Sequence, residues 1–336
     1  MQVAIVGAGA VGLNLAARLR LAGTSVRLIA RRDDATRAIA REGIRLEDPA
    51  TGRAHLAQVD VACGIAALRN LVHTPVLVCV RSGQTADLAA ELSRVVPRAV
   101  VASAQNDVDN EALLARHFAE VIGIVVRQTC TRRDDRSVLA TGAGRLVVGS
   151  HPTGMTRTAH ALADCFEAAG FDVARSDAIG ADKWLKLCVN FLSSVNALVV
   201  RSEHSHEAFV QLKQRLLEEA RATFAAAGIR PRSCDGADRG IDAEIESLRA
   251  AWEAGTTARA LPLYNACWAA LSDPNRPLES DLHHRRLLEL AARSGTPAPT
   301  HAVMLEAVLD AYQNRRGPEC CSAGELLARA REAERA

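Results

Sequence analysis

The sequence predicts an α/β protein of two domains, a doubly wound and mostly parallel sheet followed by an all-helical domain. Up to about residue 180, short apolar runs alternate with helical patterns, which is typical of a parallel sheet covered by helices on both faces. Beyond residue 181 the strand signals stop, and the patterned segments have helical period. A glycine-rich motif between the first strand and the first helix adds a third, independent indication.

The first domain, residues 1–180, is expected to contain strands at Gln2–Val6, Ser25–Ile29, Val76–Val80, Ala99–Ser103, Val121–Val126, Arg145–Val148 and Asp172–Ala174. Its expected helices are Ala10–Leu21, Asp33–Glu42, Gln84–Val95, Asn110–Arg116 and Thr156–Ala168. The second domain, residues 181–320, is expected to contain helices at Lys183–Val200, Ser205–Ala227, Asp242–Ala254, Ala258–Leu271, Glu279–Ser294 and Thr300–Tyr312. Residues 321–336 are expected to form a helical tail that is frayed from Arg329 onward.

Bulk composition excludes several classes of protein. The 336 residues suffice for two cores, and a formal net charge of +2 gives no reason to expect a nucleic-acid or anionic-membrane partner. No stretch is apolar for long enough to span a bilayer, and the chain begins directly with its first strand, so we expect a cytoplasmic protein. The nine cysteines form no C-x-x-C motif and no cluster with histidine, so neither a metal site nor a disulfide framework is expected. The adjacent Cys320 and Cys321 have no assigned role.

The glycine-rich motif is Gly7-Ala8-Gly9-Ala10-Val11-Gly12, a G-x-G-x-x-G placed between a strand and a helix. In a Rossmann-type domain the first glycine permits the tight turn, the second lets the backbone approach a pyrophosphate, and the third lets the helix pack closely on the strand. The phosphates then lie on the free N–H groups at the start of the helix. A glycine-rich turn of no function is the alternative, but the strand–loop–helix context favours dinucleotide binding.

The end of the second strand indicates which dinucleotide is bound. NAD-binding domains usually place an acidic residue there, whereas this strand leads into Arg31-Arg32. A guanidinium pairs well with a 2′-phosphate, so we favour NADP(H). Asp33-Asp34 would supply the acid if the strand ran two residues longer, and a solvated charge cluster is a further alternative.

The helical domain opens with a candidate catalytic row. Among 41 basic residues only Lys183, Lys186 and Lys213 are lysines, and a lysine, unlike an arginine, gives up a proton when it is buried. Asn190 and Ser194 follow Lys186 at intervals of four, which places the three side chains near one helix face. During reduction of a carbonyl an ammonium here would stabilise the growing negative charge on oxygen and donate the proton. A surface lysine is the alternative. We expect the substrate at the junction of the two domains.

These residues resemble the ketopantoate reductase (2-dehydropantoate 2-reductase) family over nearly the whole chain, from residue 1 to about 310. The resemblance is carried by the glycine motif, by Arg31, and by four further segments: Gln105-Asn106, Thr131-Arg132-Arg133-Asp134, the W-x-K-L-x-x-N from Trp184 to Asn190, and Leu278-Glu279-Ser280-Asp281. The lysine and glutamate segments are more discriminating than the glycines.

The resemblance implies NADPH-dependent reduction of a 2-oxo acid, with ketopantoate to pantoate in pantothenate and coenzyme A biosynthesis as the specific expectation. It implies Lys186 as the general acid, Asn190 and Ser194 as substrate ligands, and Asn106 beside both the substrate and the nicotinamide ribose. Thr131 would contact the cofactor through its backbone. Glu279 would reach the substrate hydroxyl or the nicotinamide ribose; as a residue at a helix start after Pro277, it also fits a capping role.

Three positions depart from the family pattern. Arg81 stands where the family commonly has a cofactor-binding lysine, Ser194 replaces a second asparagine, and Ala269 replaces a serine that binds the substrate carboxylate. The first of these still suits a cofactor phosphate or ribose. The other two alter the substrate pocket, because the loss of a polar donor there costs affinity or discrimination.

Three alternatives to ketopantoate reduction stay open. The first is the same chemistry on another 2-oxo acid, favoured by Ser194 and Ala269. The second is an opine-type dehydrogenase, which would rely on a histidine such as His283 or His284. The third is a non-catalytic NADPH sensor, which would not need Lys186, Asn190 or Glu279. A homodimer is possible, and the sequence does not distinguish it from a monomer.

Overall fold

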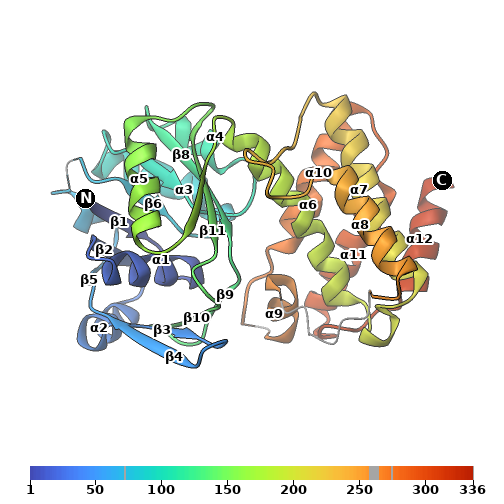
Figure 1. The fold of residues 1–336 in the computed structure, drawn as a ribbon, viewed down its shortest axis with the longest axis horizontal. Helices are drawn as coiled ribbons and strands as arrows, with labels where there is room; N and C mark the ends of the chain where they lie inside the picture. The colour runs from blue at the N-terminus through green and yellow to red at the C-terminus, as the bar shows by residue number, and fades with distance from the viewer. Residues whose placement is uncertain (72, 257–264, 274, 336) are drawn as a thin grey trace. The chain divides into compact units, whose positions relative to one another are not determined.

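The computed structural model describes residues 1–71, 73–256, 265–273 and 275–335 (Figure 1). Two compact units are present, Met1–Lys183 and Trp184–Ala336, and each is described by itself. The predicted architecture, an α/β unit with a parallel sheet followed by a helical unit, is confirmed.

In the first unit, the described strands include eight that form one sheet in the order β12-β11-β8-β7-β6-β1-β2-β5. Their bounds are Gln2–Val6 (β1), Ser25–Ala30 (β2), Asp60–Cys63 (β5), Val76–Val78 (β6), Val101–Ser103 (β7), Val121–Arg127 (β8), Arg145–His151 (β11) and Asp172–Arg175 (β12). From β5 to β8 neighbouring strands run parallel, and their chain order across the sheet is the 3-2-1-4-5-6 of a doubly wound fold. β11 pairs antiparallel with β8.

Alternate residues of the central strand pack into two different cores. Val3 and Ile5 lie in the core that includes α1 (Ala10–Leu21) and α5 (Arg157–Ala168). Ala4 and Val6 lie in the core that includes α3 (Thr85–Val95) and α4 (Asn110–Ala115). Since a strand buried on both faces reads as one apolar run, β1 is easily found in the sequence. The helix α2, Asp33–Glu42, has the bounds that the sequence predicted.

A second, smaller sheet was not predicted. Its described strands have the order β4-β3-β10-β9, with bounds Arg53–Ala57, Ile44–Asp48, Ser137–Ala140 and Cys130–Arg132. These strands are only three to five residues long and carry several charged side chains, so they give a weak apolar signal. Ile44, Leu46 and Val138 join the core that contains Leu13 of α1. The small sheet therefore packs on the helix that follows the glycine motif.

The second unit is helical, as expected. Its described helices are α6 (Ile179–Leu198, which begins in the first unit), α7 (Glu207–Ala226), α8 (Ile241–Glu253), α9 (Ala266–Ser272), α10 (Ser280–Ser294), α11 (Pro299–Gln313) and α12 (Ala323–Arg335). Most of the predicted helix Ala258–Leu271 lies outside the described residues. Among the helices that are described, none combines the length and the apolarity required to cross a membrane.

The C-terminal tail is a helix, as expected, and it is continuous to Arg335. Leu326, Leu327 and Ala330 of α12 are buried. The segment before α12 is held by a bridge in which Val200 donates its N–H to the carbonyl of Cys321, and Cys321 donates to Leu198. The apolar spacing of Leu326, Leu327 and Ala330 explains why the tail is ordered against the helical unit.

Candidate active site

The loop between β1 and α1 needs glycine at two positions for reasons internal to the protein. Gly7 has a φ of +113°, and a Cβ there would lie 2.9 Å from the carbonyl of Cys79 after β6. A Cβ on Gly12 would lie 1.9 Å from the carbonyl oxygen of Gly7. These two glycines therefore permit the turn and the close approach of helix and strand.

Gly9 is different, because nothing in the described protein requires a glycine there. Its φ is −80°, which any residue adopts, and a Cβ would meet no atom closer than the Cys79 carbonyl oxygen at 3.9 Å. A side chain at this position would instead fill the space in front of the loop. Gly9 also begins α1 without any side-chain cap, so the first N–H groups of the helix are not satisfied by a capping side chain. The loop thus fits the pyrophosphate of a dinucleotide.

The two adjacent arginines that follow β2 have different surroundings. The strand ends at Ala30, and Arg31 follows it directly with an exposed side chain for which no ion pair is found among the described residues. Arg32 is ion-paired with Asp34 and, at 3.3 Å, with Asp135. The hydrogen bond from Arg32 lowers the pKa of Asp34. Asp34 lies in the first turn of α2 and is paired with Arg32. The charged group that follows the end of β2 and is open to a ligand is therefore the guanidinium of Arg31.

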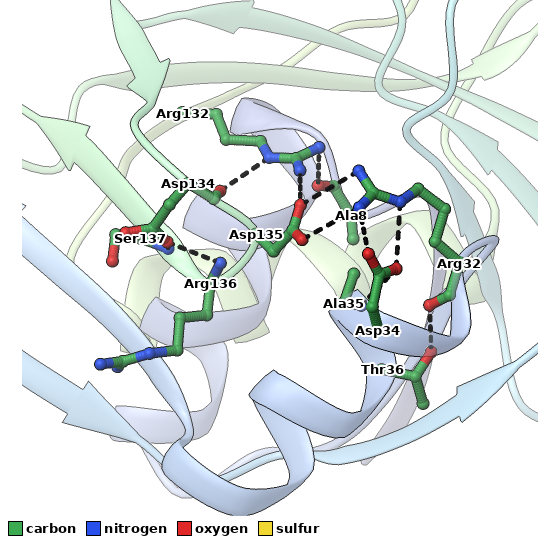
Figure 2. Close-up of polar contacts among 10 residues, drawn as sticks. All are labelled: Ala8, Arg32, Asp34, Ala35, Thr36, Arg132, Asp134, Asp135, Arg136 and Ser137. Carbon is green, nitrogen blue, oxygen red and sulfur yellow. Dashed lines mark hydrogen bonds and ion pairs between the residues drawn. The ribbon is translucent and has the colours of Figure 1, made fainter.

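The small sheet brings a further arginine to the glycine loop (Figure 2). Arg132, at the end of β9, donates a long hydrogen bond (3.5 Å) to the carbonyl of Ala8 and a shorter one (2.7 Å) to the carbonyl of Asp134. The carboxylate of Asp135 lies between Arg132 and Arg32 and contacts both. This contact was not predicted, because it depends on the pairing of β9 with β10 in the small sheet; the Thr131–Asp134 motif was the available signal. Thr131 lies on the same strand, partly buried.

The segment after β7 contains Asn106, and buried side chains hold it in place. The carbonyl of Asn106 accepts hydrogen bonds from Asn110 (2.8 Å) and from the hydroxyl of Ser82. Asp107 has a φ of +90°, a left-handed conformation that a non-glycine residue rarely adopts. Arg81 follows β6 and has an exposed side chain. Since β7, β6 and β1 are neighbours, their carboxyl ends place Asn106, Arg81 and the glycine loop at one edge of the sheet.

The predicted row on α6 is only partly as expected. Lys186 and Asn190 are both partly exposed and lie one helical turn apart. Ser194 is fully buried instead: its hydroxyl donates to the carbonyl of Phe191 (2.7 Å) and lies 2.8 Å from Nε2 of His284. Eight residues at 3.6 per turn rotate a side chain by about 80° from the starting face, which explains why Ser194 points into the helical unit. The hydroxyl of Ser194 is therefore engaged inside the helical unit, and its predicted substrate role stays a prediction.

Glu279 and Ala269 lie in the helical unit. Glu279 is the N-cap residue of α10, the helix-start position that the capping alternative predicts, although its carboxylate makes no capping hydrogen bond. Ala269 lies on α9 and is partly buried.

His284 is part of a buried chain of polar groups. Its Nδ1 lies 3.0 Å from Nδ1 of His301, whose Nε2 lies 3.0 Å from the carbonyl of Leu216. Both rings are fully buried, and burial lowers the pKa of His284 well below its ordinary value and that of His301 to about 3. With both ring nitrogens occupied inside the core, His284 is not placed as the catalytic histidine of an opine-type dehydrogenase.

The chain is similar to several known proteins. Residues 3–153 match the family model described as ketopantoate reductase PanE/ApbA. The 2-dehydropantoate 2-reductase of Halobacterium salinarum is 25% identical over 241 residues, 70% of this chain and 76% of that protein. The enzyme of the same name from Archaeoglobus fulgidus is 27% identical over 235 residues, 68% of this chain and 75% of that protein.

Solved structures show the same fold. A PanE/ApbA family ketopantoate reductase from Ralstonia eutropha JMP134 superimposes with a TM-score of 0.75 at 24% identity, covering 94% of this chain and all of that one. A D-mandelate dehydrogenase in complex with NADH and anilino(oxo)acetate superimposes with a TM-score of 0.76 at 16% identity, again over 94% of this chain and all of that one. The match thus assigns residues 3–153 to the ketopantoate reductase PanE/ApbA family model, and the chain as a whole is similar to 2-dehydropantoate 2-reductases in sequence and in fold.

Proposed function

We propose that this protein reduces a 2-oxo acid with NADPH, and that its substrate is ketopantoate, which it converts to pantoate in pantothenate and coenzyme A biosynthesis. The observation that carries the proposal is the helix α6, on which Lys186 and Asn190 lie one turn apart in a chain whose first unit has a dinucleotide-binding loop. Nine free cysteines fit a reducing cytoplasm, where this reaction would take place.

NADPH, when bound, supplies the hydride that adds to the carbonyl carbon. Lys186 stabilises the negative charge that develops on the carbonyl oxygen and donates a proton from Nζ to it, so that a 2-hydroxy acid is released and the amine is reprotonated from solvent. Asn190 donates to a substrate oxygen without adding charge. Asn106 orients the nicotinamide ribose and the substrate, and Glu279 binds a substrate or ribose hydroxyl.

The cofactor contacts follow from the first unit. Gly7-Ala8-Gly9-Ala10-Val11-Gly12 would bind the pyrophosphate, and Arg31 would bind the 2′-phosphate, which NADH lacks. Thr131 would contact the cofactor through its backbone, and Arg81 would bind a phosphate or ribose oxygen in place of lysine. These contacts make NADPH the preferred cofactor.

The replacement Lys186→Ala tests the mechanism. Loss of a general acid costs about 10²- to 10⁴-fold in turnover, whereas the dissociation constant for NADPH should change by less than about twofold, because the phosphates are bound by the first unit. Lys186→Arg keeps the positive charge but does not release a proton at working pH, so it should restore little of the turnover. A fall in NADPH binding as steep as the fall in turnover would show that Lys186 binds the cofactor or supports the fold.

Reduction of a different 2-oxo acid is the second candidate function. The inward position of Ser194 supports it, because the substrate then has one hydrogen-bond partner fewer than the family pattern supplies, and Ala269 removes another. A less hydroxylated or bulkier acid would tolerate both changes. The similarity in fold to a D-mandelate dehydrogenase is compatible with such a substrate. Assays of NADPH oxidation with several 2-oxo acids in parallel separate the two candidate functions and also test the sensor alternative.

A further inference from the structure

Lys183 is a buried lysine that the proposed mechanism does not use. Its side chain is 5% exposed and forms an ion pair with Glu111, which is 3% exposed and lies on α4. The same Nζ donates a hydrogen bond of 3.0 Å to the carbonyl of Gln105 and approaches the hydroxyl of Ser103 at 3.5 Å. One ammonium thus connects the start of α6, the start of α4 and the carboxyl end of β7.

The segment that receives this hydrogen bond needs support. Gln105 is followed by Asn106 and by Asp107, whose φ of +90° is unfavourable for a residue with a side chain. Gln105 donates from Nε2 to the hydroxyl of Thr85 (2.8 Å), and Asn110 donates to the carbonyl of Asn106 (2.8 Å). Strained backbone of this kind persists only where surrounding contacts hold it, and Lys183 contributes the charged contact.

Stability alone does not explain a buried ion pair at this position. Removing the charges from water is costly, and replacing such a pair by apolar residues of similar size often leaves stability unchanged or raises it. A lysine is also specific here, because its compact ammonium has three donors for Glu111, Gln105 and Ser103, whereas a planar guanidinium has a fixed fork of donors. In a chain with three lysines, this points to a geometric role.

We propose that Lys183, paired with Glu111, is a positioning residue for the reductase reaction. It fixes the peptide that joins Gln105 to Asn106, and thereby sets the orientation of the Asn106 side chain. This inference rests on the proposed function, in which Asn106 orients the nicotinamide ribose and the substrate. Lys183 also precedes Lys186 by three residues on α6, so its anchor holds the start of the helix that carries the general acid.

The double variant Lys183→Met with Glu111→Leu separates positioning from stability, because it removes both charges and leaves neither one buried alone. We expect kcat with the preferred 2-oxo acid to fall ten- to a hundredfold, about the effect of a small misplacement of a positioned group. The dissociation constant for NADPH and the melting temperature should stay close to those of the wild type. Lys213→Met is the matched control: this lysine is also buried, at 8% exposed, but lies over the ring of Phe209 in the helical unit. It should leave kcat unchanged.

Hydrogen–deuterium exchange provides a readout that does not depend on activity. The peptide spanning residues 104–110 should exchange faster in the double variant than in the wild type, and no faster in Lys213→Met. A double variant with wild-type exchange in this peptide, or with wild-type kcat, would overturn the positioning role. A wild-type protein that reduces none of the acids tested would overturn the proposed function instead, while the exchange measurement would still decide whether Lys183 orders the segment.

Discussion

The two units contribute to the proposed reaction by different means. In the first unit the pyrophosphate would be bound by backbone: the glycine loop is shaped by close packing at Gly7 and Gly12, and it leaves an open space at Gly9. The helical unit uses side chains, Lys186 and Asn190, presented one turn apart on α6. Substitutions in the glycine loop should therefore change cofactor binding, whereas substitutions of Lys186 and Asn190 should change turnover.

Buried polar groups differ between the units in the same way. In the first unit the charged pair Lys183–Glu111 contacts the segment that contains Asn106. In the helical unit the buried chain Ser194–His284–His301 ends on the carbonyl of Leu216, inside the unit. The first cluster is connected to a predicted site residue, whereas the second has a structural role. Burial of a polar residue is thus not by itself a sign of function; its contacts decide.

The largest effects are expected from substitutions of the loop glycines. Gly12→Ala brings a methyl group against the Gly7 carbonyl and displaces the loop, which should cost about 1–3 kcal/mol of stability and on the order of a hundredfold in NADPH affinity. Gly9→Ala should leave stability unchanged or slightly higher while it weakens NADPH binding, because its methyl occupies only the ligand's space. Thermal unfolding and fluorescence titration measure both. Unchanged NADPH affinity in Gly9→Ala would contradict the assignment of this loop.

Arg31 and Arg32 should differ although they are adjacent. Arg31→Ala should raise the dissociation constant for NADPH by about ten- to a hundredfold and leave NADH almost unaffected, since it removes charge-assisted hydrogen bonds to the 2′-phosphate worth about 1.5–3 kcal/mol. Arg32→Ala should have a smaller effect, because its guanidinium is engaged by Asp34 and Asp135 at the surface. Equal changes in the dissociation constants for NADPH and NADH in Arg31→Ala would show that Arg31 does not bind the 2′-phosphate.

Acid should destabilise the helical unit through its buried histidines. Burial lowers the pKa of His301 to about 3, against about 6.5 in the unfolded chain, so the unfolded state binds more protons as the pH falls below 6.5. This stability is fully present above pH 6.5 and is lost progressively below it, by about 2 kcal/mol at pH 5 for His301 alone. Glu219 accepts hydrogen bonds from the N–H groups of Thr300 and His301, and burial raises the pKa of its carboxyl. Because the folded state then binds this proton more readily than the unfolded state, Glu219 opposes part of the loss of stability near pH 5.

Denaturant unfolding at pH 7.5 and pH 5 measures this loss. His301→Gln should flatten the pH dependence, since it removes one titrating ring and keeps a donor for the Leu216 carbonyl. An unfolding free energy that is the same at both pH values would contradict the neutral, buried state of the pair.

Ser194→Ala is expected to have the smallest effect. It should leave kcat and KM within about twofold, and should cost about 1 kcal/mol of stability, because the buried His284 loses a hydrogen-bond partner. Steady-state kinetics and denaturant unfolding separate the two effects. A large rise in KM without loss of stability would restore Ser194 as a substrate ligand.

The sequence was sufficient for the elements that have a strong local signal. Each of these signals lies within a few consecutive residues: the apolar run of β1, the glycine turn and the charged start of α2. The structure has all three at the predicted residues. The small sheet was missed because each of its strands is short and depends on a partner distant in sequence: β3 pairs with β10, about 90 residues later. The contact of Arg132 with Ala8 depends on that sheet and could not be foreseen.

The candidate site shows the same limit. The spacing of Lys186 and Asn190 is enough to place them on one face, because four residues make about one turn. Over eight residues the rotation accumulates, and the direction of Ser194 is decided by His284, which is 90 residues away in sequence. Lys186→Ala tests the role of Lys186, the double variant of Lys183 and Glu111 tests that of Asn106, and the role of Glu279 stays a prediction.

The most direct test is to follow NADPH oxidation by absorbance while the purified protein is given ketopantoate and a set of other 2-oxo acids in parallel. We expect at least one 2-oxo acid to be reduced, and ketopantoate to be reduced fastest. Turnover of another acid with ketopantoate inert would keep the chemistry and assign the second candidate function. Tight binding of NADPH with no oxidation in the presence of any of the acids would contradict the proposed reductase activity and favour a non-catalytic role in sensing NADPH.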